Sequence, residues 1–266
     1  MRTSRTRRSM SLSATWSWRL DLIRVLLKKE LLVRYKGSFF GYLWSVMNPL
    51  ATAGIYYVVF GLISRFNQPN YLIMLLAALF PWQWVSSSIG FGANCFINNK
   101  PLVKKVAFPR LTIPFVTNLQ DMVHFLISLP VYIAFMFAYG LYPGINWLWS
   151  VPLMVLITLG TVYGICLFTG SINIFFRDLS YIVSIAMHAL FFGCPIIYPL
   201  SHVPDKFHFV FLLNPLAPMM ICWRSALYEN SIDLYYLPYA ILYAFILFSI
   251  GLFTYHKLHW KFAEAL

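Results

Sequence analysis

Long apolar stretches separated by short charged breaks occupy most of the chain after residue 36. A helix needs about 20 residues to cross the roughly 30 Å hydrocarbon core of a bilayer. The crossings predicted by this measure are at about 39–63, 71–93, 111–139, 147–176, 179–198 and 234–255. We therefore expect an all-α membrane protein in which residues 37–266 form one six-helix transmembrane domain.

Residues 207–223 form one more apolar stretch, but they fit poorly as a seventh crossing. The stretch is short and is interrupted by Asn214, Pro215 and Pro218, and proline removes a backbone donor from a helix. Such an interruption is tolerated at membrane depth only where the backbone packs on protein. We expect two short helices that fold back at the outer surface, as a re-entrant hairpin between the fifth and sixth crossings.

The region before the first crossing divides into two parts. Residues 1–15 are rich in Arg, Ser and Thr and have little to bury, so we expect a mobile basic tail. Residues 16–36 place Asp21 and Lys28 on one helical face and Leu26 on another, which predicts an amphipathic helix along the inner membrane surface. That helix is either a lipid anchor or a surface on which a cytoplasmic partner pushes, and the sequence leaves both open.

The distribution of charge gives this arrangement an orientation. Only 11% of residues are charged, against about 25% in soluble globular domains. The net charge of +12 is local, because 10 of the 20 Lys and Arg residues lie between Arg2 and Lys36. No recognition fold accompanies it, so we expect no nucleic acid. Six crossings with both termini cytoplasmic leave only Arg65, Lys206 and Arg224 outside, as the positive-inside rule requires.

Motifs for ATP or ion chemistry are missing from the sequence. There is no GxxxxGK[ST] loop to hold ATP phosphates, so the chain is not expected to be its own ATPase. Asp121, His124 and His188 are the ionisable residues well inside crossings, too few for a carrier driven by protons or sodium. Asp121 and His124 share a helix face, which favours a structural pair, and His188 is expected to be a satisfied interior group.

The four cysteines lack the spacing of a metal or redox motif. Cys194 and Cys222 fall on the same outer side in the predicted topology and are close enough to consider as a disulfide. Buried free thiols are the favoured reading, and no metal site is expected.

Aromatic residues are concentrated in the first and fifth predicted crossings. Their faces stack on sugar rings and their hydroxyls form hydrogen bonds, so they are suited to guiding a long glycan. Core packing and interfacial belts are the competing explanation. The candidate channel residues are Phe39, Tyr42, Trp44, Tyr56, Tyr57, Phe60, Phe191, Phe192 and Tyr198.

Several short motifs resemble one known family. They are Arg34-Tyr35-Lys36-Gly37-Ser38, Phe108-Pro109-Arg110, Phe176-Arg177-Asp178-Leu179, Pro195-Ile196-Ile197-Tyr198 and Asn214-Pro215. In this order and spacing the chain resembles the membrane subunits of type-2 ABC exporters that carry O-antigen, capsular polysaccharide or teichoic acid. The resemblance extends from about Leu20 to the end of the chain.

The resemblance implies a homodimer in the bacterial inner membrane, with a channel between its subunits and two copies of a separate ATPase subunit that binds ATP and Mg. It implies that the interface helix and the loop around Lys100 to Arg110 contact that ATPase, and that motion passes to the first and fifth crossings. It also implies that Asn214, Pro215 and Pro218 close the channel outside. The coupling residues implied are Arg24, Lys28, Lys100, Lys104, Lys105 and Arg110.

Charge also suggests where a substrate would bind. The diphosphate of a lipid-linked glycan, as on undecaprenyl diphosphate, is expected to meet Arg34, Lys36 and Arg177, although orientation and lipid headgroup binding explain these cations equally well. A permease for a small hydrophobic drug or lipid remains an alternative. A membrane-embedded glycosyltransferase is another, but the outer acids Asp205, Glu229 and Asp233 are scattered.

Overall fold

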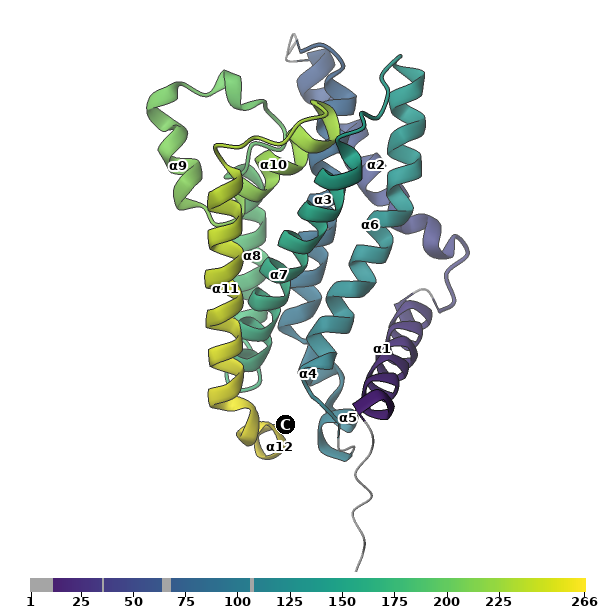
Figure 1. Cartoon of the computed structure of the whole chain (residues 1–266), viewed down its shortest axis with the longest axis vertical. Coiled ribbons are helices and arrows are strands. Elements are labelled where there is room, and N and C mark those ends of the chain that lie inside the picture. Colours follow the sequence, from purple (N-terminus) through teal and green to yellow (C-terminus); the bar gives the residue numbers. More distant parts are fainter. Residues whose placement is uncertain (1–11, 35, 64–67, 106–107) are drawn as a thin grey trace, which may run out of the picture.

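The computed structural model describes residues 12–34, 36–63, 68–105 and 108–266, which form helices joined by turns and irregular connections (Figure 1). Most of the predicted tail, and Arg65 with it, lies outside these ranges. The longer helices are α1 (Leu12–Arg34), α2 (Trp44–Tyr56), α3 (Tyr71–Ala93), α6 (Thr112–Ala138), α7 (Trp147–Asn173), α8 (Leu179–Phe192), α10 (Ala217–Tyr228) and α11 (Leu237–Leu258). The shorter ones are α4 (Cys95–Asn98), α5 (Lys100–Lys105), α9 (His208–Leu213) and α12 (Phe262–Ala265).

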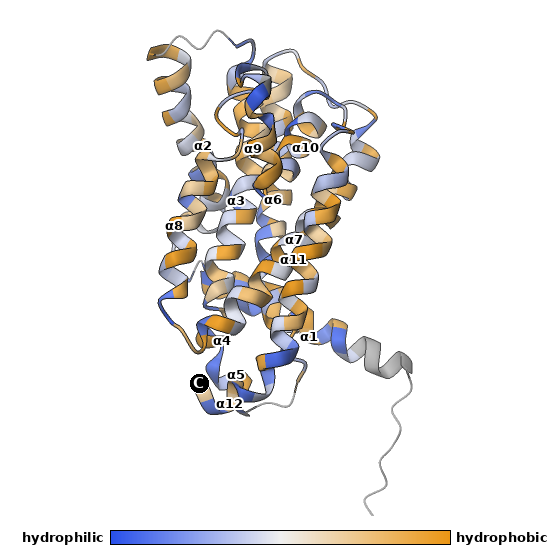
Figure 2. Ribbon diagram, turned by 90° about the vertical axis from the view of Figure 1, so that its left-hand side faces the viewer, coloured by the Kyte–Doolittle hydropathy of each residue, from blue (hydrophilic) through white to orange (hydrophobic). Residues whose placement is uncertain are grey.

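Five helical segments of the described chain are long and apolar enough to cross a membrane. Four of them contain α3, α6, α7 and α11, and the other runs from Gly41 to Ile63, joining α2 to a π-helical segment, Tyr57–Ile63. In Figure 2 their apolar residues occupy the middle of the molecule, with polar residues gathered toward both ends. The all-helical prediction is confirmed, and five of the six predicted crossings correspond to these segments.

The predicted fifth crossing, 179–198, is helical only in its first part. Helix α8 has 14 residues, which at 1.5 Å per residue gives about 21 Å, short of the hydrocarbon core. It ends at Phe192 because Pro195 lacks an amide hydrogen and disfavours helical backbone at the preceding residue.

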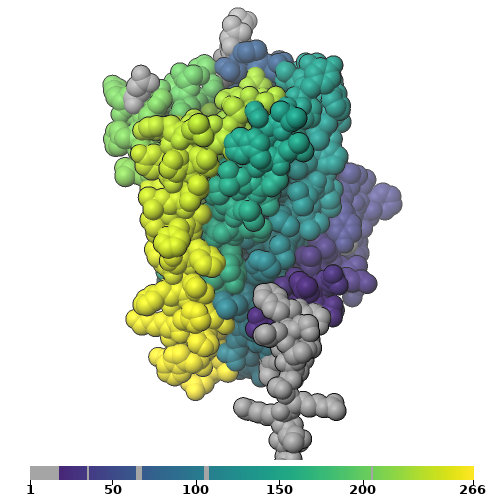
Figure 3. All heavy atoms as spheres, viewed as in Figure 1, coloured from purple at the N-terminus to yellow at the C-terminus, as the bar shows by residue number. Residues whose placement is uncertain are grey.

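Helix α3 is the centre of the bundle. It packs against α6, α7, α8 and α10, and most of its side chains are buried, whereas most of α2 and α11 is not. Figure 3 shows α11 and the teal helices side by side on one face. The most extensive pairing is between α7 and α11, where Gly164 and Gly251 bring the two backbones together. Small residues at such crossings allow close approach between membrane helices.

The stretch 207–223 forms two short helices, as predicted, with a break at Asn214. Helix α10 is longer than expected, since it continues to Tyr228 and is buried along most of its length. Arg224, predicted in an outer loop, therefore lies inside α10 and is only 5% exposed. Both helices lie at the end of the molecule opposite α5 and α12 (Figure 1).

The N-terminal helix α1 lies beside the bundle at the end that also carries α5 and α12 (Figure 1). It begins at Leu12, four residues before the predicted start, and packs on α6 with Leu26 buried. Val25, Leu32 and Val33 are exposed, which is the pattern expected of a helix whose apolar side faces lipid. The four cysteines are free thiols and all are buried, so Cys194 and Cys222 form no disulfide.

Candidate functional site

A groove of about 590 Å³ runs between α2, α3 and α8. It lies where the poorly buried helix α2 faces the short helix α8, and its walls combine aromatic and hydroxyl-bearing side chains. The residues lining it are Pro49, Thr52, Tyr56, Leu79, Trp82, Gln83, Ser86, Ser87, Gly90, Ser180, Ser184, Met187, His188, Phe191 and Phe192.

Three of the nine predicted channel residues meet in this groove. The Tyr56 ring stacks on Phe191 with 5.5 Å between centroids. Phe191 also packs against Trp82 at 5.7 Å and, edge to face, against Phe192 at 5.2 Å. Phe191 is buried whereas Phe192 is 62% exposed, so the aromatic cluster extends from the core to the open side of the groove.

Polar side chains from α2, α3 and α8 also line the groove, and none of them was among the predicted channel residues. On α8, Ser180, Ser184 and His188 are spaced four residues apart, which places them on one helix face. His188 is exposed on this face, with Nδ1 2.7 Å from the Ser184 carbonyl oxygen, so its prediction as an interior group is wrong. The spacing of these residues in an apolar helix is a signal that could have found them.

The other predicted channel aromatics lie away from the groove. Tyr57 stacks on Tyr71, with centroids 6.4 Å apart. Tyr198 donates its hydroxyl to the Phe192 carbonyl at 3.1 Å, and Phe60 packs beside Tyr56 at 6.2 Å. The remaining three lie around the connection from α1 to α2: Phe39, Tyr42 and Trp44.

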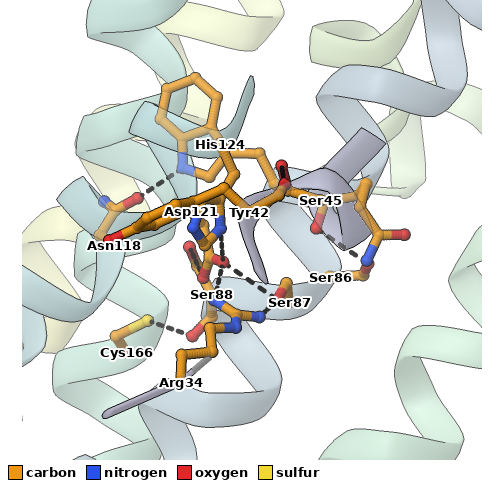
Figure 4. A network of polar contacts seen from close by, with 12 residues as sticks. Arg34, Tyr42, Ser45, Ser86, Ser87, Ser88, Asn118, Asp121, His124 and Cys166 are labelled. Atoms are coloured by element: carbon orange, nitrogen blue, oxygen red, sulfur yellow. Dashed lines mark hydrogen bonds and ion pairs between the residues drawn. The ribbon is translucent and has the colours of Figure 1, made fainter. Parts of the chain in front are cut away.

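A buried polar cluster lies near the C-terminal end of α1 (Figure 4). Arg34 Nη1 is 2.5 Å from Asp121 Oδ1, and His124 Nδ1 is 3.6 Å from the same oxygen. The predicted pair of Asp121 and His124 on one helix face is present, but the closer partner of Asp121 is Arg34, 87 residues away. Trp44 and Asn48 lie beside this cluster, around an adjoining cavity of about 310 Å³.

The predicted phosphate-binding cations lie in three different parts of the fold: Arg34 ends α1, and the other two stand in connections between helices. The charge of Arg34 is compensated by Asp121, so a phosphate would have to displace that carboxylate. Lys36, in the connection from α1 to α2, and Arg177, in the turn between α7 and α8, are both exposed.

The predicted coupling residues are gathered at the end formed by α1, α5 and α12, most of them exposed. Arg24 forms a solvent-exposed ion pair with Asp21 at 3.6 Å, and Arg110 donates to the His259 carbonyl at 2.8 Å. The side chain of Lys105 lies outside the described residues. Three of the other coupling residues have exposed side chains: Lys28, Lys100 and Lys104.

The predicted gate residues form the break between α9 and α10. Asn214 Nδ2 donates to the Gly193 carbonyl at 3.0 Å, and its Oδ1 accepts from the Leu216 amide at 3.0 Å. The Asn214 side chain therefore fastens the break to the chain that follows α8. Pro218 is the second residue of α10, in the first turn of the helix, where its missing amide hydrogen costs nothing.

The sequence of this chain is similar to those of known membrane transport proteins. An ABC-2 type transporter family model matches residues 21–228. The O-antigen export system permease protein RfbA of Klebsiella pneumoniae is 39% identical over 258 residues, covering 97% of this chain and 100% of the relative. RfbA of Myxococcus xanthus is 34% identical, covering 79% of this chain and 82% of the relative.

A more distant relative extends the match. The polysialic acid transport protein KpsM of Escherichia coli is 25% identical over 247 residues, covering 88% of this chain and 92% of the relative. The resemblance seen in the sequence motifs is thereby confirmed, and the apolar helices fit a multi-pass protein of the inner membrane. This chain belongs to the ABC-2 type transporter family.

Proposed function

We propose that the chain is the permease subunit of an ATP-driven exporter that moves a lipid-linked polysaccharide across the inner membrane. Two copies would face each other so that their grooves between α2, α3 and α8 form one channel. The observation that carries this proposal is the composition of the groove, in which Tyr56, Phe191 and Phe192 share the lining with hydroxyl-bearing residues. Rings can slide over the apolar faces of sugars while hydroxyls exchange hydrogen bonds with them. O-antigen export by the relatives agrees with it.

The proposed topology has six crossings, both termini in the cytoplasm, and α9 with α10 as a re-entrant hairpin at the outer surface. In it α8 and the turn that follows complete the fifth crossing, packed on α3. The positions of α1 and α12 at one end of the molecule and α9 at the other agree with this count (Figure 1).

Thiol labelling tests the topology, because the four native cysteines are each at most 3% exposed. Burial also raises the pKa of the Cys95 thiol, which keeps it protonated and unreactive. In spheroplasts, a membrane-impermeant maleimide should label Lys206→Cys directly. It should label Lys104→Cys and Lys257→Cys only after the membrane is opened. Labelling of Lys104→Cys in closed spheroplasts would contradict the proposal.

A separate ATPase subunit, present in two copies and holding ATP and Mg, would supply the energy. The surface proposed for it is the end formed by α1 and α5, where Arg24, Lys28, Lys100 and Lys104 are exposed. For the diphosphate of the substrate, such as undecaprenyl diphosphate, we favour Lys36 and Arg177, since Arg34 already has a carboxylate partner.

Replacing Tyr56 by alanine is expected to lower surface glycan by about tenfold, through lost stacking on the moving sugar, since removing aromatic contact area costs more than 1 kcal/mol. Export is measured as cell-surface glycan normalised to the amount of permease in the membrane. Tyr142→Ala, an exposed tyrosine outside the groove, is the matched control and should export normally. Normal export by Tyr56→Ala would count against the groove as the glycan path.

Deletion of the gene separates glycan from a small hydrophobic cargo. If the cargo is a drug or lipid, deleting the whole gene should leave surface glycan unchanged, whereas the proposal requires that glycan to be lost.

A glycosyltransferase is disfavoured by the position of Asp233. Its Oδ1 accepts hydrogen bonds from the Tyr235 and Tyr236 amides at 2.9 and 3.3 Å, so this carboxylate caps a turn. The Asp205 side chain lies outside the described residues.

A further inference from the structure

The C-terminal end of α1 is held to the bundle by a partly buried ion pair. Arg34 Nη1 donates to Asp121 Oδ1 at 2.5 Å, and Nη2 donates to Ser87 Oγ at 2.6 Å (Figure 4). The guanidinium also lies over the Phe91 ring, 4.5 Å from its centroid. The side chain of Asp121 is 3% exposed and that of Arg34 is 23% exposed, so water screens this pair less than it screens an ion pair on the surface.

The carboxylate of Asp121 joins two further helices at the same point. Ser87 donates to Oδ1 at 3.1 Å and Ser88 donates to Oδ2 at 2.9 Å, which ties α6 to α3. We call Arg34, Asp121, Ser87 and Ser88 the α1 joint. Through it, a displacement of the end of α1 acts directly on α3, the central helix of the bundle, and on α6.

The covalent route from α1 to α2 is poorly suited to carrying the same displacement. Gly37 and Gly41 adopt positive φ of +80° and +50°, and a Cβ added at either would meet nothing within 4 Å. Phe39, between them, is 95% exposed. A loosely packed connection with two glycines bends easily, because glycine crosses between backbone regions at little cost.

A second contact fixes α1 to the neighbouring cytoplasmic element. Lys29 Nζ donates to Asn99 Oδ1 at 2.7 Å, and Asn99 immediately precedes α5. The two elements proposed to meet the ATPase are thus tied to each other, and α1 is tied to the bundle at its far end.

We propose that the α1 joint passes movement of α1 to α3 and α6, and that Arg34 and Asp121 are positioning residues which couple ATP hydrolysis to export. The inference rests on the proposed function. It replaces the expectation that motion reaches the first and fifth crossings directly. Helix α2 would move because it packs on α3 and α6, and α8 would move because it packs on α3.

The test uses the full permease with its ATPase subunit, and measures ATP hydrolysis by the purified complex and surface glycan in cells. Arg34→Gln and Asp121→Asn should each assemble with the ATPase and keep hydrolysing ATP while export falls by about tenfold, a typical size for coupling between sites. Arg34→Lys, which retains the charge, should recover part of the export. The exchange of Arg34→Asp with Asp121→Arg should also recover export. Lys257→Gln, which removes an exposed cation at the same end, is the control.

Asp121→Asn distinguishes the joint from a phosphate site. If Arg34 serves only to bind the substrate phosphate, freeing it from Asp121 leaves export normal or raises it, and the proposal is overturned. Normal export by Arg34→Gln, or ATP hydrolysis and export falling in proportion, would overturn it as well.

Ser88→Ala provides a milder variant should loss of the ion pair prevent folding, and Ser88 does not line the groove. It keeps the charges and removes the hydrogen bond from Ser88 to Asp121 Oδ2, and reduced export per ATP hydrolysed is expected. An unchanged ratio would contradict the joint. The wild-type complex distinguishes failure of the joint from failure of the proposed function. If the wild type exports no glycan, the proposed function itself is wrong. If the wild type exports glycan and the variants export as much glycan per ATP hydrolysed, only the joint is wrong.

Discussion

Gly251→Ala is expected to lower the melting temperature of the purified permease more than any other single methyl addition among the described glycines. The new Cβ would lie 2.0 Å from the carbonyl oxygen of Gly164 and 3.0 Å from its Cα. Backbone atoms cannot swing aside as a side chain can, so α11 must move away from α7 along their whole contact. Overpacking costs about 1–3 kcal/mol, and this position belongs at or above the upper end.

A matched control for that substitution is Gly160, which lies on α7 one turn before Gly164. A Cβ added at Gly160 meets nothing within 4 Å, and alanine favours helix over glycine by about 1 kcal/mol. Gly160→Ala should therefore leave the melting temperature in detergent unchanged or raise it slightly. Equal melting temperatures for Gly251→Ala and the wild type would show that α7 and α11 are not in backbone contact.

Arg224→Met is the second substitution from which we expect a large loss of stability. The buried guanidinium donates through Nη1 to the Pro195 carbonyl at 2.9 Å and to the Tyr198 carbonyl at 3.0 Å, so it holds α10 to the segment that follows α8. Hydrogen bonds to charged groups contribute about 1.5–3 kcal/mol each, and methionine leaves both carbonyls buried without this donor. We expect a loss on the order of 3 kcal/mol in the free energy of unfolding, again measured in detergent.

Two companion variants show whether that loss comes from the hydrogen bonds. Arg224→Lys keeps the charge but lacks the planar fork, so it should be intermediate. Lys206→Met removes an exposed cation at the same end of the molecule and should change stability little. If Arg224→Met is as stable as the wild type, then α10 is held by its apolar contacts alone, including those around Trp223.

Features that depend only on residues close together in the chain were predictable from the sequence. The apolar stretches gave five membrane-length helices, and the proline-interrupted stretch at Asn214 gave two short helices. The prediction was less accurate where one residue ends an element: α8 stops at Phe192 instead of continuing to Tyr198, and α10 extends past Trp223. The family resemblance was also available from short motifs, which the comparisons confirmed.

Candidate site residues were harder to predict, because residue type does not indicate which way a helix face points. Tyr56 and Tyr57 are adjacent aromatics in the first crossing, yet one lines the groove and the other packs on Tyr71. The polar stripe of Ser180 and Ser184 was present in the sequence at helical spacing, but it became meaningful only beside α2 and α3.

By itself, the sequence determined that this protein is a bundle of apolar helices in a membrane, since hydrocarbon thickness and side-chain polarity act on each segment separately. It also determined that the chain has no phosphate loop of its own. Only the tertiary structure decided that Arg34 meets Asp121 and that Arg224 is buried in α10. Those contacts join residues far apart in the chain, and packing of whole helices, which no local pattern records, brings them together.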